Sequence, residues 1–499
     1  MRDDTPSVAF ETQRAAETGG VAAFCARHFA ALACLVLALA AFNLTFRLGS
    51  EFLTEWDESL YATAASEAVD AGHWIGTTME GELDYYNTKP PLNVWLIGLT
   101  FKVFGKSLIA LRAISVVAAW LTVLVLLVWT RRSRGPLVAL LAGLVLATSF
   151  GFIHVHSGRS ANTDALFTLI VVLTVVTLWA EQRARWARVW LGPLLAGAFL
   201  LRGMAVLMPL GIIAAVWVLR RPKLARAWAP TIVALVLCLV PVGAWMIARY
   251  RIDQWRFLDR LFFYDFVART TDVIEEHPGG VFYYLNILQK HQFDWLFLGL
   301  VALLLAPLSW AMLRGSFPRW REHGFAVLMT AWAGVTLIEP TLMRTKLPWY
   351  LNTFYPAFAI GIAWLVVHAL SGAGTSPQWR RRVLAGAFVL AFAVAESKLV
   401  WYSFVYRDLA LTDQSLVLAE MEELAGHRLY RERADRAGTF VTGLAHAEPR
   451  YAPDTQSFLK ESQPGDYLIT SEPVSHPELH LVRSKGRYSL YRHGTRTSR

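Results

Sequence analysis

Cysteine and charge are both scarce in this sequence. The three cysteines among the 499 residues, Cys25, Cys34 and Cys238, lie in or beside apolar segments, which excludes a disulfide framework and a Cys-x-x-Cys metal site. Charged residues make up 17% of the chain, against roughly 25% in soluble proteins, and hydrophobic residues make up 55%. This composition excludes a disordered, fibrous or nucleic-acid-binding chain. A repeat of about 20 to 50 residues is also lacking, which excludes a solenoid.

Long apolar runs are abundant instead. The first extends from Phe29 to about Leu48 and is close to the roughly 20 residues that span a bilayer. We interpret it as a membrane span and not as a cleaved signal peptide, because residues 1–28 form a long leader with several acidic side chains. Further apolar runs lie near residues 107–129, 136–153, 163–180, 189–201, 203–219, 229–248, 295–313, 324–338, 349–370 and 383–402. The sequence therefore predicts an all-α polytopic membrane protein with about eleven transmembrane helices.

Basic residues gather in the short loops between these runs. The net charge is +10, and a surplus of lysine and arginine is typical of cytoplasmic loops. If the N-terminus is cytoplasmic, all of these clusters fall on one side; they lie at 131–134, 182–188, 220–226, 314–321 and 380–382. We therefore expect a multi-pass inner-membrane protein with a cytoplasmic tail at 1–28, a transmembrane domain at 29–402 and an extracytoplasmic domain at 403–499.

Two outer loops follow from this orientation, at residues 49–106 and 249–294. Within the first, residues 57–71 and 91–104 have helical patterns that are too short and too interrupted to span a membrane. We predict that these two helices lie along the membrane interface, with their carboxylates facing a cavity above it.

The segment after residue 403 has the composition of a soluble protein. A helical pattern covers Ser415–Gly426, and short runs at Tyr467–Thr470 and Tyr488–Tyr491 are typical of strands. Pro464-Gly465 and Pro473 mark turns between such elements. The sequence predicts a small C-terminal α/β domain.

Two carboxylates occupy positions where a charge is costly. Asp57 comes directly after the first span, and Asp164 lies at the outer end of the fourth, so both are expected at one depth. A carboxylate at the mouth of a helix bundle needs a partner or a water-filled cavity, and so it indicates a functional site. For Asp164 an alternative stays open, in which its side chain only caps a helix N-terminus.

Basic side chains are predicted on the same side, against the general bias of outer loops. A phosphate head group at the outer leaflet is the simplest explanation, because ammonium and guanidinium groups pair with phosphate oxygens through charge-assisted hydrogen bonds. The alternative for each residue is that its side chain extends along the interface to reach water. The residues are Lys89, Arg202, Arg269, Arg344 and Lys346.

Six short blocks follow one another in a fixed order between residues 29 and 370. They are Trp56–Tyr61 (WDESLY), Gly72–Trp74 (GHW), Asn87–Leu92 (NTKPPL), Gly158–Asp164 (GRSANTD), Lys346–Tyr350 (KLPWY) and Tyr355–Pro356. In this order and spacing they resemble the dolichyl-phosphate-mannose protein mannosyltransferase family, especially its bacterial branch of lipid A aminoarabinose transferases. Each block alone is weak evidence, whereas the ordered set is specific.

The resemblance implies a membrane glycosyltransferase of the GT-C architecture. Such an enzyme transfers a sugar from a polyprenyl-phosphate donor to an acceptor on the extracytoplasmic side, here an envelope component such as lipid A, another glycan or a protein. By their places in the family's motifs, Asp57 is implied as the catalytic carboxylate, Asp164 as the second acidic position and Lys89 as a contact of the donor phosphate. Thr88 and Arg202 depart from the family pattern, in which glutamate and lysine are usual, and this leaves the metal dependence and the exact substrate open.

These assignments define a candidate mechanism. Asp57 removes the proton of the acceptor hydroxyl, while Lys89, assisted by Arg269, neutralises the departing polyprenyl phosphate. Asp164 orients Asp57, the acceptor or the sugar. A retaining displacement through two close carboxylates is the formal alternative.

The other candidates are grouped by ligand. We expect the donor phosphate to be bound by Lys89, Arg269, Arg344, Lys346 and Tyr350. We expect further substrate contacts from Glu58, Tyr61, Arg202 and His277. No metal ligand is assigned and no cofactor is expected beyond the lipid-linked donor, although a divalent metal stays open. The expected partners are membrane lipid, the polyprenyl-phosphate sugar and an envelope acceptor, and no nucleic acid is expected.

A nonenzymatic reading also stays open. Before its motifs are considered, a basic polytopic protein is more often a transporter, in which intramembrane charges mark a permeation path. Here the charges gather in outer loops and at helix ends, and the sequence has no clear inverted repeat, which favours the transferase. A membrane scaffold that presents the C-terminal domain does not explain why the outer loops are so polar.

Overall fold

The computed structural model describes residues 20–79, 81–220, 228–273, 277–305, 324–371, 378–433 and 435–494. Contacts within the chain divide it into two compact units. Unit 1 comprises Met1–Thr45, Thr88–Leu92 and Ser115–Leu399, and unit 2 comprises Phe46–Asn87, Asn93–Ile114 and Val400–Arg499. The predicted domains divide the chain differently, by side of the membrane, and that division stays a prediction.

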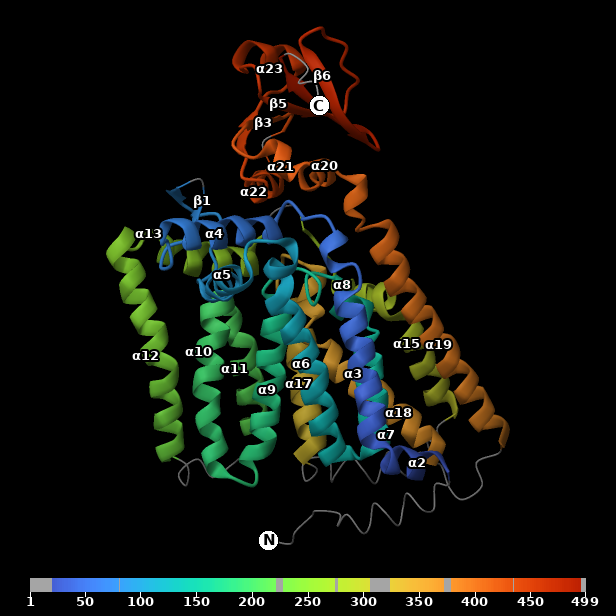
Figure 1. Cartoon of the computed structure of the whole chain (residues 1–499). Helices are drawn as coiled ribbons and strands as arrows, with labels where there is room; N and C mark the ends of the chain where they lie inside the picture. The colour runs from blue at the N-terminus through green and yellow to red at the C-terminus, as the bar shows by residue number, and fades with distance from the viewer. Residues whose placement is uncertain are drawn as a thin grey trace. The chain divides into compact units, whose positions relative to one another are not determined.

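Unit 1 is a bundle of long apolar helices (Figure 1). Its principal helices are α3 (Phe29–Thr45), α6 (Leu108–Arg134), α7 (Pro136–Ala147), α9 (Asp164–Glu181), α10 (Leu191–Arg202), α11 (Leu207–Arg220), α12 (Trp228–Asp253), α15 (Tyr283–Leu305), α17 (Gly324–Leu342), α18 (Tyr355–Ser371) and α19 (Gln378–Val405). Shorter elements connect them: α2 (Val21–Arg27), α8 (Phe150–His154), η2 (Arg185–Trp190), η3 (Gly203–Val206), α13 (Arg256–Asp259), the π-helix η5 (Arg260–Ala268), α14 (Arg269–Thr271) and η7 (Pro348–Leu351).

Seven helical segments among the described residues are long and apolar enough to cross a membrane. Together with shorter apolar helices such as α7 and α18, they place a helix in every apolar run that the sequence predicted. The run at 295–313 lies only partly inside the described residues, where α15 extends to Leu305. The chain is thus a multi-pass membrane protein, as the apolar composition predicted.

Small residues allow the bundle helices to approach one another closely. A Cβ added to Gly143 of α7 would lie 2.6 Å from Leu127 of α6, and one added to Gly192 of α10 would collide with the backbone of Ala234 in α12. Small residues at helix contacts are typical of membrane bundles, where van der Waals packing replaces the hydrophobic effect. Between α6 and α7 the chain reverses at Gly135, whose φ of 90° suits glycine.

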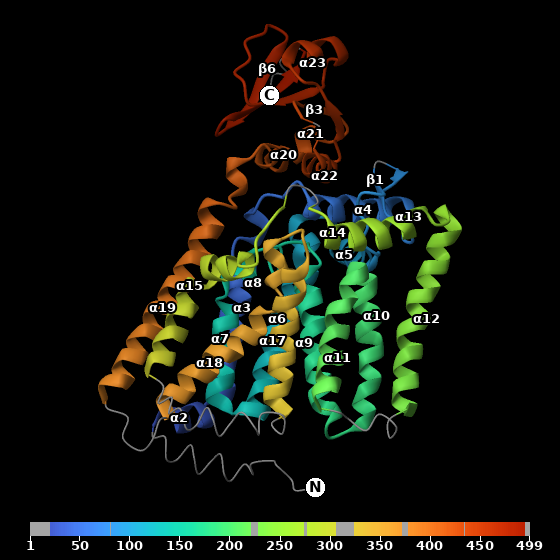
Figure 2. The ribbon, with the colours of Figure 1, turned by 180° about the vertical axis from the view of Figure 1, so that it is seen from behind.

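The predicted basic clusters lie at one end of this bundle. Helices α6, α9 and α11 end there and α19 begins there, as Figures 1 and 2 show. These ends carry Arg131–Arg134, residues 182–188, Arg220 and Arg380–Arg382. The predicted clusters at 221–226 and 314–321 lie outside the described residues, as does most of the tail at 1–28. The side of the membrane that this end faces stays a prediction.

Unit 2 combines the first outer loop with the C-terminal segment. Its loop contains η1 (Leu48–Ser50), α4 (Asp57–Ala71), the hairpin β1 (Thr78–Met79) and β2 (Glu82–Leu83), and α5 (Leu92–Phe104). The helices predicted at 57–71 and 91–104 are therefore confirmed, while their position along the interface stays a prediction. Gly72, with a φ of 79°, ends α4 in the left-handed conformation that glycine adopts easily.

The C-terminal segment is an α/β domain, as predicted. Its five-stranded sheet has the order β4-β3-β5-β7-β6, with β3 parallel to β4 and β5, and β7 antiparallel to β5 and β6. The elements are η8 (Leu409–Leu411), α20 (Gln414–Ala419), α21 (Met421–Leu424), β3 (Arg428–Arg431), α22 (Arg436–Leu444), β4 (Glu448–Tyr451), α23 (Thr455–Glu461), β5 (Tyr467–Thr470), β6 (Leu479–Lys485) and β7 (Tyr488–His493). Tyr430, Phe458 and Leu468 lie in its buried core.

Three predicted elements of this domain can be compared with the structure. The strand at 467–470 is confirmed as β5, and the strand at 488–491 is confirmed within β7. The single helix expected at Ser415–Gly426 is instead two short helices, α20 and α21, because the backbone leaves the helical conformation at Glu420 (φ −120°, ψ 31°).

Candidate active site

Asp57 lies at the start of α4 in unit 2. It is the first helical residue and is half-buried, and Trp56 before it is exposed. Two acidic residues in the first turn favour the start of a helix here, because carboxylates interact well with its positive end. The Ser59 hydroxyl donates a 2.9 Å hydrogen bond to the carbonyl of Trp56 and stabilises this turn.

Glu58, next to Asp57, is completely buried and belongs to an ion-pair network. Its carboxylate accepts hydrogen bonds from Arg112 Nε at 2.8 Å and Arg112 Nη2 at 3.2 Å, and it also accepts from the backbone and hydroxyl of Thr54. Burial alone would raise the pKa of Glu58, but Arg112 and the nearby Arg407 outweigh it and lower that pKa to about 2. Glu58 is therefore a fixed anion, and its predicted contact with substrate stays a prediction.

Arg112 is the residue in this network that sequence reasoning missed. It is fully buried and also donates hydrogen bonds to the backbone carbonyls of Leu48, Glu51 and Phe52, so it stabilises the loop that leads to Asp57. The available signal was an arginine inside the apolar run at 107–129, a position that is costly without partners. Tyr61, one turn along α4, is buried as well.

Asp164 and Arg202 form a pair within unit 1. Asp164 begins α9 and Arg202 ends α10, and Arg202 Nη1 donates to Asp164 Oδ1 at 2.5 Å. Thr163 holds the N-cap position, so Asp164 is one residue further into the helix than the capping alternative supposed. The Arg202 guanidinium also faces the rings of Phe167 at 5.2 Å and Tyr350 at 6.0 Å. Three residues that the sequence assigned to different roles thus lie together.

Lys89 belongs to the same region of unit 1. It is half-buried in the bend before α5, and Pro90 follows it. Gly203, directly after Arg202, has a φ of 57°, and a Cβ added there would lie 3.6 Å from Pro90. The backbone next to Lys89 is therefore adjacent to the backbone next to Arg202, which brings the NTKPPL block to the Asp164–Arg202 pair.

Two other motif segments of unit 1 also meet. The His156 ring stacks on Trp349 with centroids 3.7 Å apart, and Asn352 Nδ2 donates to the carbonyl of Val155 at 2.9 Å. Arg159 is buried and donates to the carbonyl of Asn43 at 2.6 Å. The segment directly before GRSANTD and the segment around KLPWY are therefore neighbours in space although almost 200 residues separate them in sequence.

Lys346 binds the end of α17. Its buried ammonium group donates to the carbonyls of Pro340 at 3.1 Å, Thr341 at 2.5 Å and Met343. A cation suits the negative end of a helix, and burial lowers the pKa of Lys346. Its predicted contact with the donor phosphate stays a prediction.

The remaining predicted residues line the neighbouring loop. The carbonyl of the exposed His277 accepts the backbone N–H of Lys346 at 3.0 Å, and the carbonyl of Thr270 accepts that of the exposed Arg344 at 3.3 Å. Arg269 begins α14, and its side chain lies outside the described residues.

Comparisons with known proteins point to one family. Residues 88–245 match the family model described as dolichyl-phosphate-mannose-protein mannosyltransferase. An undecaprenyl phosphate-alpha-4-amino-4-deoxy-L-arabinose arabinosyl transferase from Pseudomonas aeruginosa (strain LESB58) is 32% identical over 63% of the chain and 55% of its own length. Its counterpart from Pseudomonas savastanoi pv. phaseolicola is 29% identical over 68% of the chain and 62% of its own length. The chain is thus similar to the dolichyl-phosphate-mannose-protein mannosyltransferase family and to aminoarabinose transferases.

Solved structures support the fold of the chain. ArnT from Cupriavidus metallidurans, bound to undecaprenyl phosphate, superposes with a TM-score of 0.64 over 92% of the chain and 97% of its own, at 16% identity. The same protein in the apo state gives a TM-score of 0.63. The chain therefore has the GT-C fold of ArnT, as the resemblance implied. It spans about half to two thirds of the length of the two Pseudomonas relatives.

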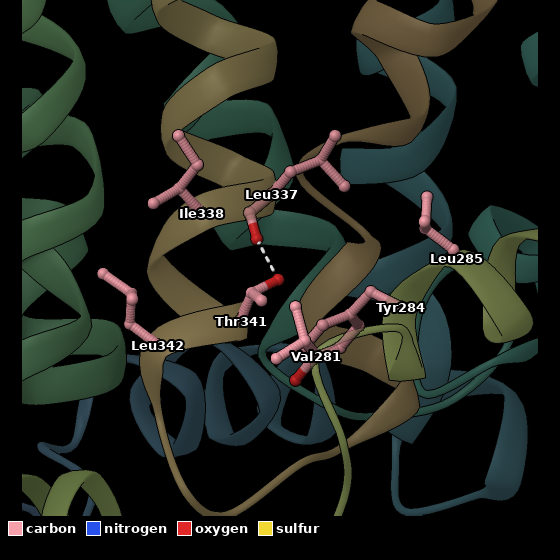
Figure 3. A pocket seen from close by; sticks show the side chains of 7 residues that line it. All are labelled: Val281, Tyr284, Leu285, Leu337, Ile338, Thr341 and Leu342. Atoms are coloured by element: carbon pink, nitrogen blue, oxygen red, sulfur yellow. Dashed lines mark hydrogen bonds between the residues drawn. The ribbon is translucent and has the colours of Figure 1, made fainter.

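The region that matches the family model contains Lys89, Asp164 and Arg202, whereas Asp57 precedes it. Unit 1 also contains an apolar cavity of about 210 Å³ between the start of α15 and the end of α17 (Figure 3). It is lined by Val281, Tyr284, Leu285, Leu337, Ile338, Thr341 and Leu342. The Thr341 hydroxyl points back to the carbonyl of Leu337 at 2.6 Å, so it leaves the wall apolar. Such a cavity suits a hydrocarbon segment and not a charged group.

Within the described part of the chain, no three histidine, cysteine, aspartate or glutamate side chains come together to hold a metal ion. The network around Glu58 is held by arginine.

Proposed function

We propose that this protein is a membrane glycosyltransferase that moves a sugar from a polyprenyl-phosphate donor to an acceptor of the cell envelope on the extracytoplasmic face. The observation that carries the proposal is the gathering of separate motif residues in unit 1. Lys89, Asp164, Arg202 and Tyr350 come from four segments of the chain and lie in one region of the bundle. That region lies largely within the match to the mannosyltransferase family model.

The residues suit an inverting transfer. The acceptor hydroxyl oxygen attacks the anomeric carbon of the donor sugar, its proton passes to the Asp57 carboxylate, and the bond from that carbon to the phosphate oxygen breaks. The polyprenyl phosphate leaves with the electron pair. Lys89 neutralises the phosphate, and Arg269, Arg344, Lys346 and Tyr350 complete its binding site. This leaving group needs no protonation by a second carboxylic acid if cations hold it.

The role of base is assigned to Asp57 by its place in the family's acidic motif, and the surroundings of Asp164 favour an orienting role for the second carboxylate. The Asp164 carboxylate already accepts a 2.5 Å hydrogen bond from Arg202, and a carboxylate held in this way suits orientation of a substrate more than removal of a proton. Asp57 stands half-buried at a helix start. Glu58, Tyr61, Arg202 and His277 are assigned to further substrate contacts.

The two aminoarabinose transferase relatives suggest the first donor to test, undecaprenyl phosphate-4-amino-4-deoxy-L-arabinose. Purified protein is incubated with this donor and with lipid A, and both sugar transfer and donor binding are measured. Asp57→Asn keeps the shape of the side chain but removes its basicity, so turnover should fall about 10²- to 10⁴-fold while donor binding survives. Asp164→Asn should lose less, because an amide oxygen still accepts from Arg202.

Two outcomes would contradict the proposal in different ways. Full turnover in Asp57→Asn would remove this residue as the base. Absence of transfer by the wild type to lipid A, to other envelope glycans and to protein acceptors, together with solute flux in liposomes, would favour the transporter. Mass spectrometry of the envelope from a strain that lacks the gene, compared with its parent, identifies the natural acceptor.

A further inference from the structure

The segment that leads to Asp57 is held by the C-terminal domain within unit 2. Residues 51–55 run in extended or turn conformation before α4 begins. Glu51 forms an isolated antiparallel bridge with Asp408, and the backbone N–H of Phe52 donates to the carbonyl of Arg407 at 3.2 Å. Arg407 Nε also lies 3.4 Å from the Glu51 carboxylate. The contact thus begins immediately after α19.

Gln414 continues this contact one residue further along. Its side-chain amide serves both backbone groups of Leu53: the Leu53 N–H donates to Gln414 Oε1 at 2.8 Å, and Gln414 Nε2 donates to the Leu53 carbonyl at 2.9 Å. Both residues are buried. The Gln414 side chain therefore pairs with the backbone of Leu53 as a neighbouring strand would, through both the N–H and the carbonyl of Leu53.

Glu55 is the contact nearest to Asp57. Its two carboxylate oxygens accept the backbone N–H groups of Arg436 at 3.0 Å and Ala437 at 2.9 Å, at the start of α22. These N–H groups have no partner within their own helix, so a carboxylate satisfies them well. Helix α22 also packs on α4. The ring of Phe440 from α22 stacks on Phe101 of α5 with centroids 6.0 Å apart.

We infer that the C-terminal domain positions the proposed catalytic carboxylate, with Glu55 and Gln414 as positioning residues. The inference rests on the proposed function, because it assumes that Asp57 reacts. Glu55 stands two residues before Asp57, and the domain contacts the chain at Glu51, Phe52, Leu53 and Glu55. An error of about 1 Å in the placement of a reacting group can cost a reaction about 100-fold. The domain is therefore part of the catalytic machinery, and its role is separate from any binding of the acceptor.

The test compares Glu55→Ala and Gln414→Met with a matched control in the same domain. The carboxylate of Asp454, the N-cap of α23, accepts the N–H of Ser457 at 2.7 Å, much as Glu55 accepts N–H groups at the start of α22, but both partners lie inside the C-terminal segment. Asp454→Ala therefore removes a similar helix contact without touching the Asp57 segment. Gln414→Met keeps the volume of the side chain and removes both of its hydrogen bonds.

The full-length proteins are assayed in detergent for sugar transfer and for donor binding. We expect kcat to fall about 10- to 100-fold in Glu55→Ala and Gln414→Met, with an unchanged donor Kd, and to stay at the wild-type value in Asp454→Ala. Hydrogen exchange supplies a readout independent of activity: the amides of residues 51–60 should exchange faster in Glu55→Ala and not in Asp454→Ala.

The outcomes separate the inference from the function on which it rests. Wild-type kcat in a folded Glu55→Ala protein would overturn the inference, and so would equal losses in all three variants, because these would reflect stability alone. If the wild type transfers no sugar, or if Asp57→Asn retains full turnover, the proposed function fails and the positioning role fails with it. The exchange rates then still show whether the domain holds residues 51–55.

Discussion

The buried pair of Glu58 and Arg112 gives the sharpest test of how unit 2 is stabilised. Glu58→Gln keeps the shape of the side chain and removes its charge, so the Arg112 guanidinium keeps the carbonyls of Leu48, Glu51 and Phe52 but loses its ion-pair partner at position 58. A pKa of about 2 for Glu58, in place of the ordinary 4.5, corresponds to about 3 kcal/mol of stability at pH 7. Removing one partner of a buried ion pair typically costs about 3 to 5 kcal/mol, which agrees with the value obtained from the pKa of Glu58.

The pH dependence of this effect follows from the direction of the shift. The pKa of Glu58 is lower in the folded protein than in the unfolded chain, so its contribution is complete above about pH 4.5 and is lost as the pH falls towards 2. The difference in free energy of unfolding between the wild type and Glu58→Gln should therefore be about 3 kcal/mol at pH 7 and should shrink below pH 4.5.

The assay is chemical denaturation in detergent micelles, followed by protease cleavage within residues 403–499, which reports on unit 2. Asp70→Asn is the matched control, because Asp70 also lies on α4 and pairs with Lys106 at 2.5 Å, but its side chain is 60% exposed. An exposed pair of this kind contributes about 0 to 1 kcal/mol. Equal losses in the two variants at pH 7, or a difference that grows between pH 5 and pH 3, would refute the reasoning.

Two further predictions concern the donor and the orientation. Lys89→Ala should weaken binding of the polyprenyl-phosphate sugar about 10- to 150-fold, because a charge-assisted contact contributes roughly 1.5 to 3 kcal/mol. The control is Lys102→Ala, at an exposed lysine of α5, which should bind the donor as the wild type does. Unchanged donor binding in Lys89→Ala would assign this lysine to the interface alone. In a cysteine-free background, a membrane-impermeant thiol reagent should label Ser475→Cys and not Arg132→Cys in intact cells, because the basic clusters predict a cytoplasmic end at Arg132. Labelling of Arg132→Cys alone would reverse the topology.

The local patterns of the sequence predicted local structure well. The helix at 57–71 was predicted with the bounds that α4 has, because its acidic start and the glycine after it are both local signals. The strand Tyr467–Thr470 was found because it is apolar and lies between turns. In contrast, β3 (RLYR) and β4 (EPRY) were missed: each has only four residues, β4 contains a proline, and parallel pairing brings them together across an intervening helix.

The sequence was less informative about what each charged side chain contacts. Lys346 was assigned to a phosphate on the basis of charge and position, and this stays a prediction; the structure adds that its ammonium group binds the carbonyls at the end of α17. A lysine shortly after an apolar helix fits both descriptions, and charge alone does not distinguish them. Arg112 was overlooked for the opposite reason, since its partners come from a loop more than 50 residues earlier in the chain.

The ion pair between Asp164 and Arg202 bears on the proposed roles of the two carboxylates. Each residue was predicted as functional from its own position, with Asp164 assigned to catalysis and Arg202 to substrate binding. Their contact joins the start of α9 to the end of α10, 38 residues later in the chain. The contact with Arg202 separates the proposed roles of the two carboxylates on physical grounds. A carboxylate that already holds a guanidinium at 2.5 Å has its charge balanced and its direction fixed, which suits orientation of a sugar. In the proposed mechanism the proton goes to Asp57, and the contacts of residues 51–55 with the C-terminal domain fix the backbone that leads to this carboxylate.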